Sequence, residues 1–592
     1  MKFGIKKSLL FFSAMSALAL TALPANAAAP PPVEADMVVR NAKIFTSNTA
    51  KPWSETIAIS KGKIVAIGSE KEVAKFVGPN SNVIDAQQRL VVPGIIDAHL
   101  HLAYAVKDRR GLNCFFEPDA GLDAILSAVE GCVKTVKPGE WIAAKAWDSG
   151  LLPVLTSAAA LRRLDAITPD NPVIMRSDSI HDRWANSVAL KKAGVTKDTK
   201  DPKGGKIGRD PQTGELNGLL IEIPAAELVD PISPLGDFMA GESTEQLDEQ
   251  ARLLLPLGVT GWNDALVTAE TAQAYSELEK AGKLHARVGL SINIDPNRMK
   301  PSEFPALYKS LATIDSGHIS TKFAKIFLDG TPVSKTAFVL EPYLPDVEHG
   351  SDYHGTPFVK QAVLDQAVTA LDAMGVSVKM HATGNGSVRE ALDAIAAARK
   401  ANGPKGPFHT IAHAGHIAPA DVPRFRPLGA IIDASPTLWY PGSIMDAIVG
   451  TLGKERGEAF FLFRTDIRNG VTVAGGTDWK TLPAEYSDLW DGIEGMVTRR
   501  NPTGKPSGRL HPEEALDLGT VMRIYTINSA IALSIDKVAG SLEVGKSADF
   551  SILNQNIFAR PPECISGTRS ILTVFEGKVV YRTDRDEEPA CN

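Results

Sequence analysis

Short runs of alternating apolar and polar residues lie near both ends of the chain, and this alternation is typical of β-strands. Within residues 36–92 two such runs flank a turn signal at residues 61–63, and residues 572–575 and 579–581 flank a similar turn near the other end. Because chain ends often lie close together, we expect residues 36–92 and 535–585 to build one small β-sandwich-like domain.

The long middle of the chain alternates short apolar runs with stretches of helical periodicity, such as residues 361–374 and 388–401. This alternation is typical of an α/β fold with a parallel sheet. The runs that qualify as strands are residues 91–101, 258–264, 287–294, 321–329, 375–382, 408–414, 429–436 and 470–479. Eight strands with helices between them predict a (β/α)8 TIM barrel, which we place at residues 93–534.

The connection between the first and second predicted strands is far longer than an ordinary βα loop. We therefore expect an inserted subdomain at about residues 103–250. It has a strand–helix pattern of its own, at residues 172–175 and 184–193, and a glycine-rich hairpin at residues 204–208. The sequence thus predicts a barrel with two additions, a composite β domain and an insert after the first strand.

The first residues have the three parts of a secretory signal. Lys2, Lys6 and Lys7 precede an apolar stretch at residues 8–23, and Ala25-Asn26-Ala27 offers small residues for cleavage. The apolar stretch is shorter than the roughly 20 residues of a spanning helix. We predict that residues 1–27 form a signal peptide and that the mature protein is periplasmic or secreted, without membrane attachment. An uncleaved anchor is the alternative.

The amino-acid composition indicates which class of molecule the protein binds. Hydrophobic residues make up 44% of the 592 residues, and the net charge of -6 comes without long runs of like charge. A nucleic-acid-binding protein would need a basic patch, so we expect a small-molecule substrate and no nucleic acid; a homo-oligomer stays open. Cys114, Cys132, Cys564 and Cys591 can form disulfides in an oxidising compartment, Cys114 with Cys132 for example, but the sequence leaves the pairing open.

Candidate chemistry begins with His99-Leu100-His101, at the end of the first predicted barrel strand. Residues i and i+2 of a strand point to the same face, so this spacing presents two imidazoles side by side. Neutral imidazole is a ligand for zinc, iron or nickel. Two surface histidines at a strand end are the alternative interpretation of the motif alone.

Four more ligand-type residues lie near the carboxyl ends of predicted strands: Lys325 on the fourth, His381 on the fifth, His413 on the sixth and Asp478 on the eighth. Barrel enzymes build their sites at these ends, so we expect all of these side chains around one pocket. Taken singly, each has a plainer interpretation: a hydrogen-bonded core histidine, a helix N-cap for Asp478, or a lysine that reaches solvent.

These residues stand in motifs that resemble the amidohydrolase superfamily, and in detail its YtcJ-like branch, also called amidohydrolase family 3, with similarity to N-substituted formamide deformylases. The matching motifs are residues 93–101, 325–331, 336–337, 341–343, 381–385, 411–414, 475–479 and the closing motif at 539–549, with His181 and residues 184–187 and 189–190 in the insert. Two positions depart from the family pattern: Asn385 stands where aspartate is usual, and Ala412 where glutamate is usual. The specificity of close relatives therefore does not carry over.

The resemblance implies a centre with one or two divalent ions, for which zinc is the first expectation. His99 and His101 would bind the more buried metal, and His381 and His413 the second. Asp478 would contact the metal and the nucleophilic water. Lys325 would bridge two metals after carboxylation by CO2, a reaction that needs the neutral amine.

The function expected from this site is hydrolysis of a C–N bond, in an amide, N-acyl, N-formyl, carbamate or cyclic amide substrate, by an enzyme of the EC 3.5 type. A metal lowers the pKa of bound water from 15.7 to about 7, and Asp478 and Lys325 are the expected catalytic residues. His181, Trp147 and Trp479 are candidates for the substrate pocket. Alternatives are an ester or lactone hydrolase, a deaminase, or a non-catalytic binding barrel that has lost its metal.

Overall fold

The computed structural model describes residues 34–102, 111–117, 120–236, 243–435, 440–478 and 488–584, together with residues 589 and 591. At its centre is a sheet of eight parallel strands in the order β20-β19-β18-β17-β16-β15-β14-β8. The strands are β8 (Ile95–Leu100), β14 (Val259–Val267), β15 (Arg287–Asn293), β16 (Ile319–Phe327), β17 (Ser377–Ala382), β18 (His409–His413), β19 (Ala430–Ala434) and β20 (Thr472–Gly475). The predicted α/β barrel, and each of its eight strands, is confirmed.

The barrel sheet is nearly closed where its first and last strands meet. The backbone N–H of Asp478, just after β20, donates to the carbonyl of His99 in β8 at 2.7 Å. The N–H and hydroxyl of Thr477 both donate to the carboxylate of Asp97, at 3.0 and 2.6 Å. A Cβ on Gly476 would lie 2.5 Å from the backbone nitrogen of His99, so only glycine fits this approach.

Helices cover the outside of the barrel because their apolar residues recur on one face. In α11 (Gln361–Ala373) the buried residues include Leu364, Val368 and Leu371, the i, i+4, i+7 spacing of an amphipathic helix. The other helices of ten residues or more in this part are α8 (Thr244–Leu254), α9 (Ala269–Lys280), α12 (Asn385–Asn402), α14 (Ser443–Leu452) and α17 (Leu489–Thr498). Shorter ones are α10 (Phe304–Leu311), α13 (Phe425–Leu428), α15 (Lys454–Glu458), α16 (Phe463–Arg468), α18 (Leu518–Arg523) and α19 (Ser529–Ala532).

The first predicted strand, residues 91–101, is two strands in the structure. β7 (Leu90–Pro93) pairs with β2 and β21 in a small sheet, and β8 begins two residues later in the barrel. The break is at Gly94, where a Cβ would lie 2.0 Å from the hydroxyl of Thr260. Proline at 93 has no N–H for a ladder, so the chain changes sheets at this Pro-Gly pair.

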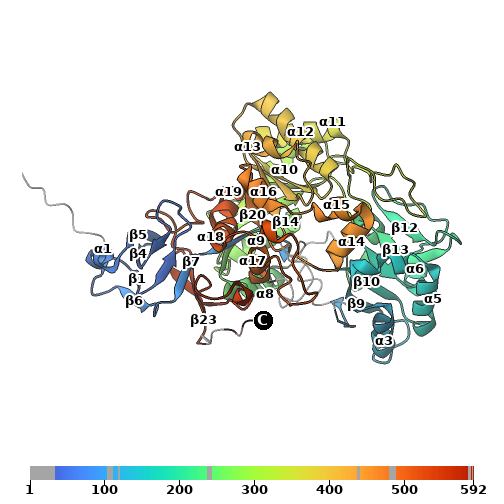
Figure 1. The fold of residues 1–592 in the computed structure, drawn as a ribbon, viewed down its shortest axis with the longest axis horizontal. Helices are drawn as coiled ribbons and strands as arrows, with labels where there is room; N and C mark the ends of the chain where they lie inside the picture. Colours follow the sequence, from blue (N-terminus) through green and yellow to red (C-terminus); the bar gives the residue numbers. More distant parts are fainter. Residues whose placement is uncertain are drawn as a thin grey trace, which may run out of the picture.

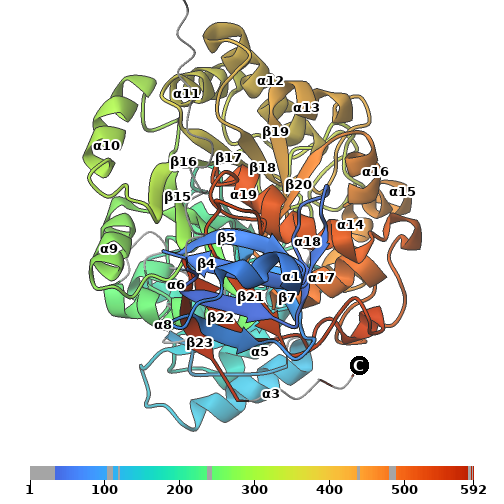
Figure 2. The same cartoon turned by 90° about the vertical axis from the view of Figure 1, so that its left-hand side faces the viewer.

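Strands from both ends of the chain share one six-stranded sheet, ordered β23-β22-β21-β7-β2-β3. Its other strands are β2 (Lys43–Phe45), β3 (Trp53–Ser54), β21 (Phe550–Leu553), β22 (Ser570–Phe575) and β23 (Lys578–Arg582). A four-stranded sheet of β1 (Met37–Arg40), β4 (Thr56–Ser60), β5 (Lys63–Gly68) and β6 (Asn82–Asp85) shares an apolar core with it. Figure 2 shows these strands side by side. Where to divide the domain, at residues 36–92 and 535–585, stays a prediction.

Between β8 and β14 the chain forms a separate five-stranded sheet with two apolar cores of its own. Its strands are β9 (Ile142–Trp147), β10 (Val173–Ser177), β11 (Arg183–Ala185), β12 (Lys206–Arg209) and β13 (Leu216–Ile221). The helices α3 (Leu122–Val133), α5 (Ala158–Ile167) and α6 (Ser187–Lys192) pack beside it. We call this part the insert; it lies at the opposite end of the molecule from the terminal sheets (Figure 1).

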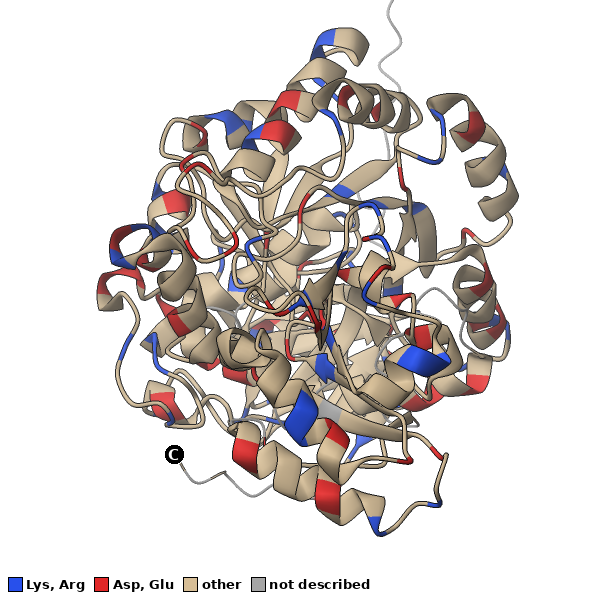
Figure 3. Ribbon diagram, turned by 90° about the vertical axis from the view of Figure 1, so that its right-hand side faces the viewer, with Lys and Arg blue, Asp and Glu red and all other residues tan. Residues whose placement is uncertain are grey.

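Acidic and basic positions are interspersed on the side of the molecule that carries the insert (Figure 3). Two disulfides join cysteines: Cys114 with Cys132 in the insert, and Cys564 with Cys591 near the C-terminus. Among the helices of the described ranges, none combines the length and the apolar character that crossing a bilayer requires.

Candidate metal centre

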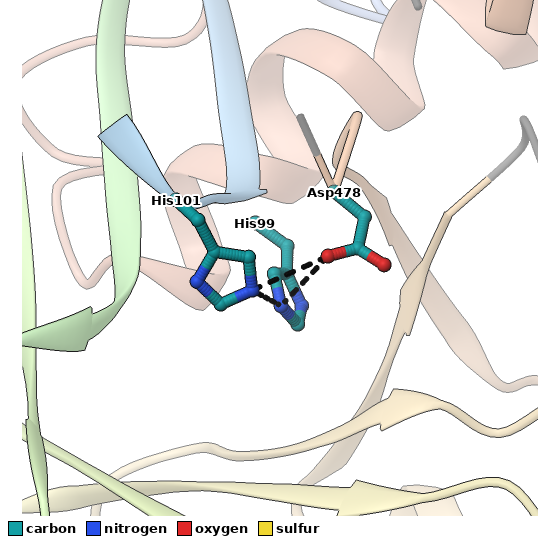
Figure 4. Close-up of side chains that lie close together, drawn as sticks. All are labelled: His99, His101 and Asp478. Atoms are coloured by element: carbon teal, nitrogen blue, oxygen red, sulfur yellow. Dashed lines mark hydrogen bonds and ion pairs between the residues drawn. The ribbon is translucent and has the colours of Figure 1, made fainter. Parts of the chain in front are cut away.

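Three buried donors meet where β8 and β20 end: His99, His101 and Asp478 (Figure 4). The two Nε2 atoms lie 3.3 Å apart. The Oδ1 atom of Asp478 lies 3.3 Å from Nε2 of His101 and 3.7 Å from Nε2 of His99. The three donor atoms are therefore directed at a common point, the arrangement that the alternation of a strand predicts for an H-x-H pair.

The backbone after β20 places Asp478 at this point. Its φ of +50° is in the left-handed region, which few non-glycine residues adopt. The hydrogen bonds to His99 and Asp97 described above hold this turn against the first strand. Burial raises the pKa of Asp97 to about 7, while its hydrogen bonds with Thr477 act in the opposite direction. Asp97 is thus a structural partner that ties the first strand to the last.

A carboxylate behind His99 fixes the orientation of its ring. Nδ1 of His99 donates to Oδ2 of Asp433 at 2.8 Å, and both side chains are fully buried. The ammonium of Lys379 bonds the same carboxylate and also donates to the carbonyl of Ala98 at 2.9 Å. Because Nδ1 carries the hydrogen, the lone pair of Nε2 faces the donor cluster, as in carboxylate–histidine–metal arrangements.

Burial favours the neutral form of three histidines in this region: His99, His381 and His413. Burial lowers the pKa of His99 well below its usual range, and the nearby charges of Lys325 and Lys379 act in the same direction. Burial likewise lowers the pKa of His381 and of His413 well below the usual range. Only neutral imidazole can bind a metal, so the environment keeps these rings in the form that a metal centre needs.

His381 and His413 lie beside the three-donor cluster without joining it. The ring of His413 is 5.2 Å from that of His99 and 4.7 Å from that of His381, measured between centroids. Nδ1 of His413 lies 3.9 Å from Oδ2 of Asp478. Nε2 of His381 donates to the carbonyl of Gly330 at 3.1 Å, which leaves Nδ1 as the nitrogen able to bind a cation.

Lys325, on β16, lines the same cavity as His101, His381, His413 and Asp478. Its side chain is fully buried. Burial, and then the charge of Lys379, lowers the pKa of Lys325 to about 7. A substantial share of this amine is therefore neutral near pH 7. The cavity is also lined by apolar residues from the barrel and from the segments around it, which include Ile180, Ile223, Leu266, Ile448, Phe460 and Phe461.

Of the three residues expected to contact substrate, the structure brings His181 to the cavity. Its ring lies 5.3 Å from that of His381, centroid to centroid, and Nδ1 lies 2.6 Å from Oε2 of Glu222. Trp147, at the end of β9, is instead buried in the core of the insert and is not among the lining residues. The side of the strand that it occupies packs against the insert's own helices. Trp479 lies outside the described residues.

Three residues around the cavity were not among the sequence predictions: Asp433, Lys379 and Glu222. Asp433 lies near the carboxyl end of the seventh barrel strand, and Lys379 lies two residues before His381 on the fifth. The rule that selected the other candidates, a ligand-type residue near a strand's carboxyl end, applies to both. Glu222 lies in the insert, where no barrel pattern indicates it.

Comparison with known proteins identifies the family. The model of the amidohydrolase family matches residues 82–581, most of the sequence. The chain belongs to the amidohydrolase family. It is 28% identical over 577 residues to the N-substituted formamide deformylase of Arthrobacter pascens, which covers 93% of this chain and 98% of that one. It is 25% identical over 545 residues to the YtcJ protein of Bacillus subtilis, with 91% and 98% coverage.

A solved structure shows the same fold. The metal-dependent hydrolase of Pyrococcus horikoshii superposes with a TM-score of 0.64 at 21% identity, covering 90% of this chain and 99% of that one. The family assignment identifies an enzyme, a metal-dependent hydrolase of the class that acts on non-peptide C–N bonds. The resemblance of the motifs to this family is thereby confirmed.

The residues present fit a divalent cation. Two imidazoles and one carboxylate, all buried and converging, match the nitrogen and oxygen donors that zinc and similar ions take in hydrolases. Asp433, bonded behind His99, supplies the outer carboxylate that such ligands usually have. His99, His101 and Asp478 are the residues that would hold the ion, with Lys325, His381 and His413 placed around it.

Proposed function

We propose that this chain is an exported zinc-dependent amidohydrolase that cleaves the C–N bond of a small amide, N-acyl, N-formyl, carbamate or cyclic amide substrate. The observation that carries the proposal is the convergence of His99, His101 and Asp478 at the mouth of an amidohydrolase barrel. The deformylase from Arthrobacter pascens, to which the chain is similar over most of its length, supports a substrate with an N-substituted amide bond.

A bound divalent cation supplies Lewis acidity and lowers the pKa of water, so that hydroxide is available near pH 7. His99 and His101 would hold the ion, since their Nε2 atoms lie 3.3 Å apart at the mouth of the barrel. Asp478 accepts the proton that the attacking water loses and passes it to the leaving nitrogen as the C–N bond breaks. The buried position of Asp478, 6% exposed, keeps bulk water from competing for that proton.

Lys325 has the second catalytic role. We propose that its neutral amine adds to CO2, forming an N–C bond and releasing one proton; the resulting carbamate would offer two oxygens as ligands for divalent cations. The lowered pKa of Lys325 supports this step, because only the unprotonated amine reacts. In that arrangement His381 and His413, which flank the first cluster, would hold the second ion.

The same water activation serves an ester, a lactone or a ring that loses ammonia. A substrate panel separates these reactions: N-formyl, N-acyl and cyclic amides on one side, and matched esters, lactones and amino-substituted heterocycles on the other. Elemental analysis of the same preparation identifies the metal and its stoichiometry. Zinc with turnover of an amide supports the proposal, whereas turnover confined to esters or to aromatic amines overturns it.

Export is proposed on the N-terminal signal pattern, and the disulfides support it. Disulfides persist in oxidising compartments and are rare in the cytosol, and the structure pairs all four cysteines of the chain. The mature protein should then begin at Ala28 or within a residue or two of it. N-terminal sequencing of protein recovered from the native envelope tests this, and a soluble cytoplasmic protein that retains Met1 would contradict it.

A further inference from the structure

His181 and Glu222 form a buried pair at the edge of the insert, on the cavity wall next to His381. Nδ1 of His181 donates to the carboxylate of Glu222 at 2.6 Å. The Glu222 side chain is 3% exposed. A carboxylate accepts and does not donate, so Nδ1 of His181 carries a hydrogen. The histidine ring itself lines the cavity.

The backbone is unusual at both ends of this pair. Glu222 has φ 67° and ψ 157°, a region that is nearly restricted to glycine, and Ile180, directly before His181, has φ 60°. Such conformations persist only where the surroundings impose them, and they concentrate at functional sites. At this place the two unusual backbone conformations direct the carboxylate of Glu222 toward the imidazole of His181.

The surroundings of Glu222 connect the insert to the barrel. Its second oxygen accepts from the hydroxyl of Thr336 at 2.5 Å, in the loop after β16. A Cβ on Gly330 would lie 1.9 Å from that same oxygen, so glycine is required there. The carbonyl of Gly330 in turn accepts from His381. Glu222 is thus fixed between the insert's histidine and the loop that orients a barrel histidine.

A further carboxylate holds the backbone at the same junction. The N–H of Glu222 donates to Oδ1 of Asp182 at 3.0 Å, and the hydroxyl of Ser334 donates to Oδ2 of Asp182 at 2.7 Å. Asp182 directly follows His181, so the two ends of the pair are bound to each other and to the loop after β16. His181 therefore has one orientation with respect to the metal ligands.

We propose that His181 takes the tautomer with its single hydrogen on Nδ1 and recognises the N–H of the scissile amide through its Nε2 lone pair, and that Glu222 is a positioning residue that fixes this tautomer. The enzyme would then select substrates with an N–H on the leaving side over isosteric esters. This inference rests on the proposed amide hydrolysis. It adds the reason why the insert, and not the barrel alone, determines which carbonyl compounds are cleaved.

The test compares one amide with the ester of the same shape, both cleaved by the holoenzyme. In Glu222→Gln the side-chain amide can donate to Nδ1, which moves the ring hydrogen to Nε2 and removes the acceptor. We expect kcat/KM for the amide to fall about tenfold, the effect of one unmatched buried hydrogen bond, and kcat/KM for the ester to change less than twofold. His181→Ala should shift the amide-to-ester ratio by a similar factor.

Two controls separate positioning from a general structural role. Glu215→Gln makes the same change at the other end of β13, where Glu215 is exposed and pairs with Arg162; this variant should keep the wild-type ratio. In the His181→Ala background, Glu222→Gln should have no further effect on the ratio, because it acts through His181. Metal content and melting temperature are measured for every variant.

Equal losses on amide and ester, additive effects of the two substitutions, or metal loss in Glu222→Gln would each overturn the proposed role of the pair. A wild-type enzyme that cleaves the ester and not the amide would instead overturn the proposed function, and this role of His181 with it. The wild-type amide rate therefore distinguishes failure of the function from failure of the inference.

Discussion

The cavity has two walls that are built in different ways. The barrel wall consists of the candidate metal ligands on the barrel strands, and the insert wall consists of His181 and its partner Glu222. On the barrel side the candidate ligands lie on or just after β8, β16, β17, β18 and β20, where adjacent parallel strands fix their spacing. On the insert side His181 and Glu222 lie outside the strands, 41 residues apart, and they are fixed by contacts with each other and with the loop after β16. The barrel wall provides the candidate metal ligands, and the insert wall provides the paired side chains of His181 and Glu222.

Because the two walls are built differently, we expect substitutions in them to have different effects. A strand end holds a ligand through a ladder of hydrogen bonds, so a change of one ligand leaves the frame intact. The insert holds His181 through a few specific contacts with one loop, so the position of His181 depends on each of those contacts. We therefore expect changes in the barrel wall to act on metal content, and changes in the insert to act on substrate choice and local stability.

The largest effect is expected from replacing both His99 and His101 with alanine. The double variant loses two of three donors in the buried cluster, so we expect loss of the metal and a fall in activity of roughly 10³-fold or more. Far-UV circular dichroism should stay close to wild type. The control replaces His285 and His318, which precede β15 and β16 at the opposite end of the barrel. Full metal content in the test variant would contradict the assignment.

Lys325 is expected to give the next largest effect. Lys325→Ala should lose most activity and part of the metal, and bicarbonate or a short carboxylic acid should restore some activity by occupying the vacated bridge. Lys325→Arg should not recover, because guanidinium stays charged and does not react with CO2. Metal stoichiometry and turnover are the measurements. Near wild-type turnover in Lys325→Arg would show that the lysine is structural, and that the centre is mononuclear or is bridged by another group.

The barrel wall could be predicted from sequence because two simple regularities determine it. Strand alternation puts His99 and His101 on one face, and parallel strands bring their carboxyl ends together, which places Lys325, His381 and His413 around the same cavity. Asp433 follows the same rule and could have been selected. The order of the strands, and the position of the site at their carboxyl ends, can be predicted without knowing the tertiary structure.

The insert wall could not be predicted in this way. Trp147 can face a core or a cavity, depending on which helices pack on each side of β9. A single aromatic residue in the sequence does not indicate which of the two sides it is on. The structure gives no support to its selection as a substrate contact, because Trp147 lies in the apolar core of the insert and not on the cavity wall. The pairing of Glu222 with His181 and with Thr336 links residues 41 and 114 positions apart, a distance that no local pattern spans.

A smaller effect is expected when the outer carboxylate of the barrel wall is changed. Asp433→Asn keeps the shape but weakens the hydrogen bond that orients His99, and outer-sphere changes of this kind cost 10- to 100-fold in metal affinity, approximately. Competition with a chelator measures the affinity. Asp372→Asn is the matched control, because Asp372 bonds His409 at 3.0 Å away from the cavity lining. Equal affinities in the two variants would remove Asp433 from the metal site.

The smallest effect on catalysis is expected from the disulfide of the insert. Cys114 and Cys132 close a loop with a sequence separation of 18 next to the start of the insert, and a loop of this size contributes about 3 kcal/mol to stability in the chain-entropy model. Replacing both with serine should speed hydrogen exchange in peptides from residues 120–236, while barrel peptides stay protected. Metal content should stay at the wild-type value, and the amide-to-ester ratio should change only at temperatures where the insert begins to open. The control replaces Cys564 and Cys591, whose disulfide lies outside the insert. If the Cys114 and Cys132 variant lost its metal at low temperature, the two walls would be one cooperative unit, and the division between metal binding by the barrel and substrate recognition by the insert would fail.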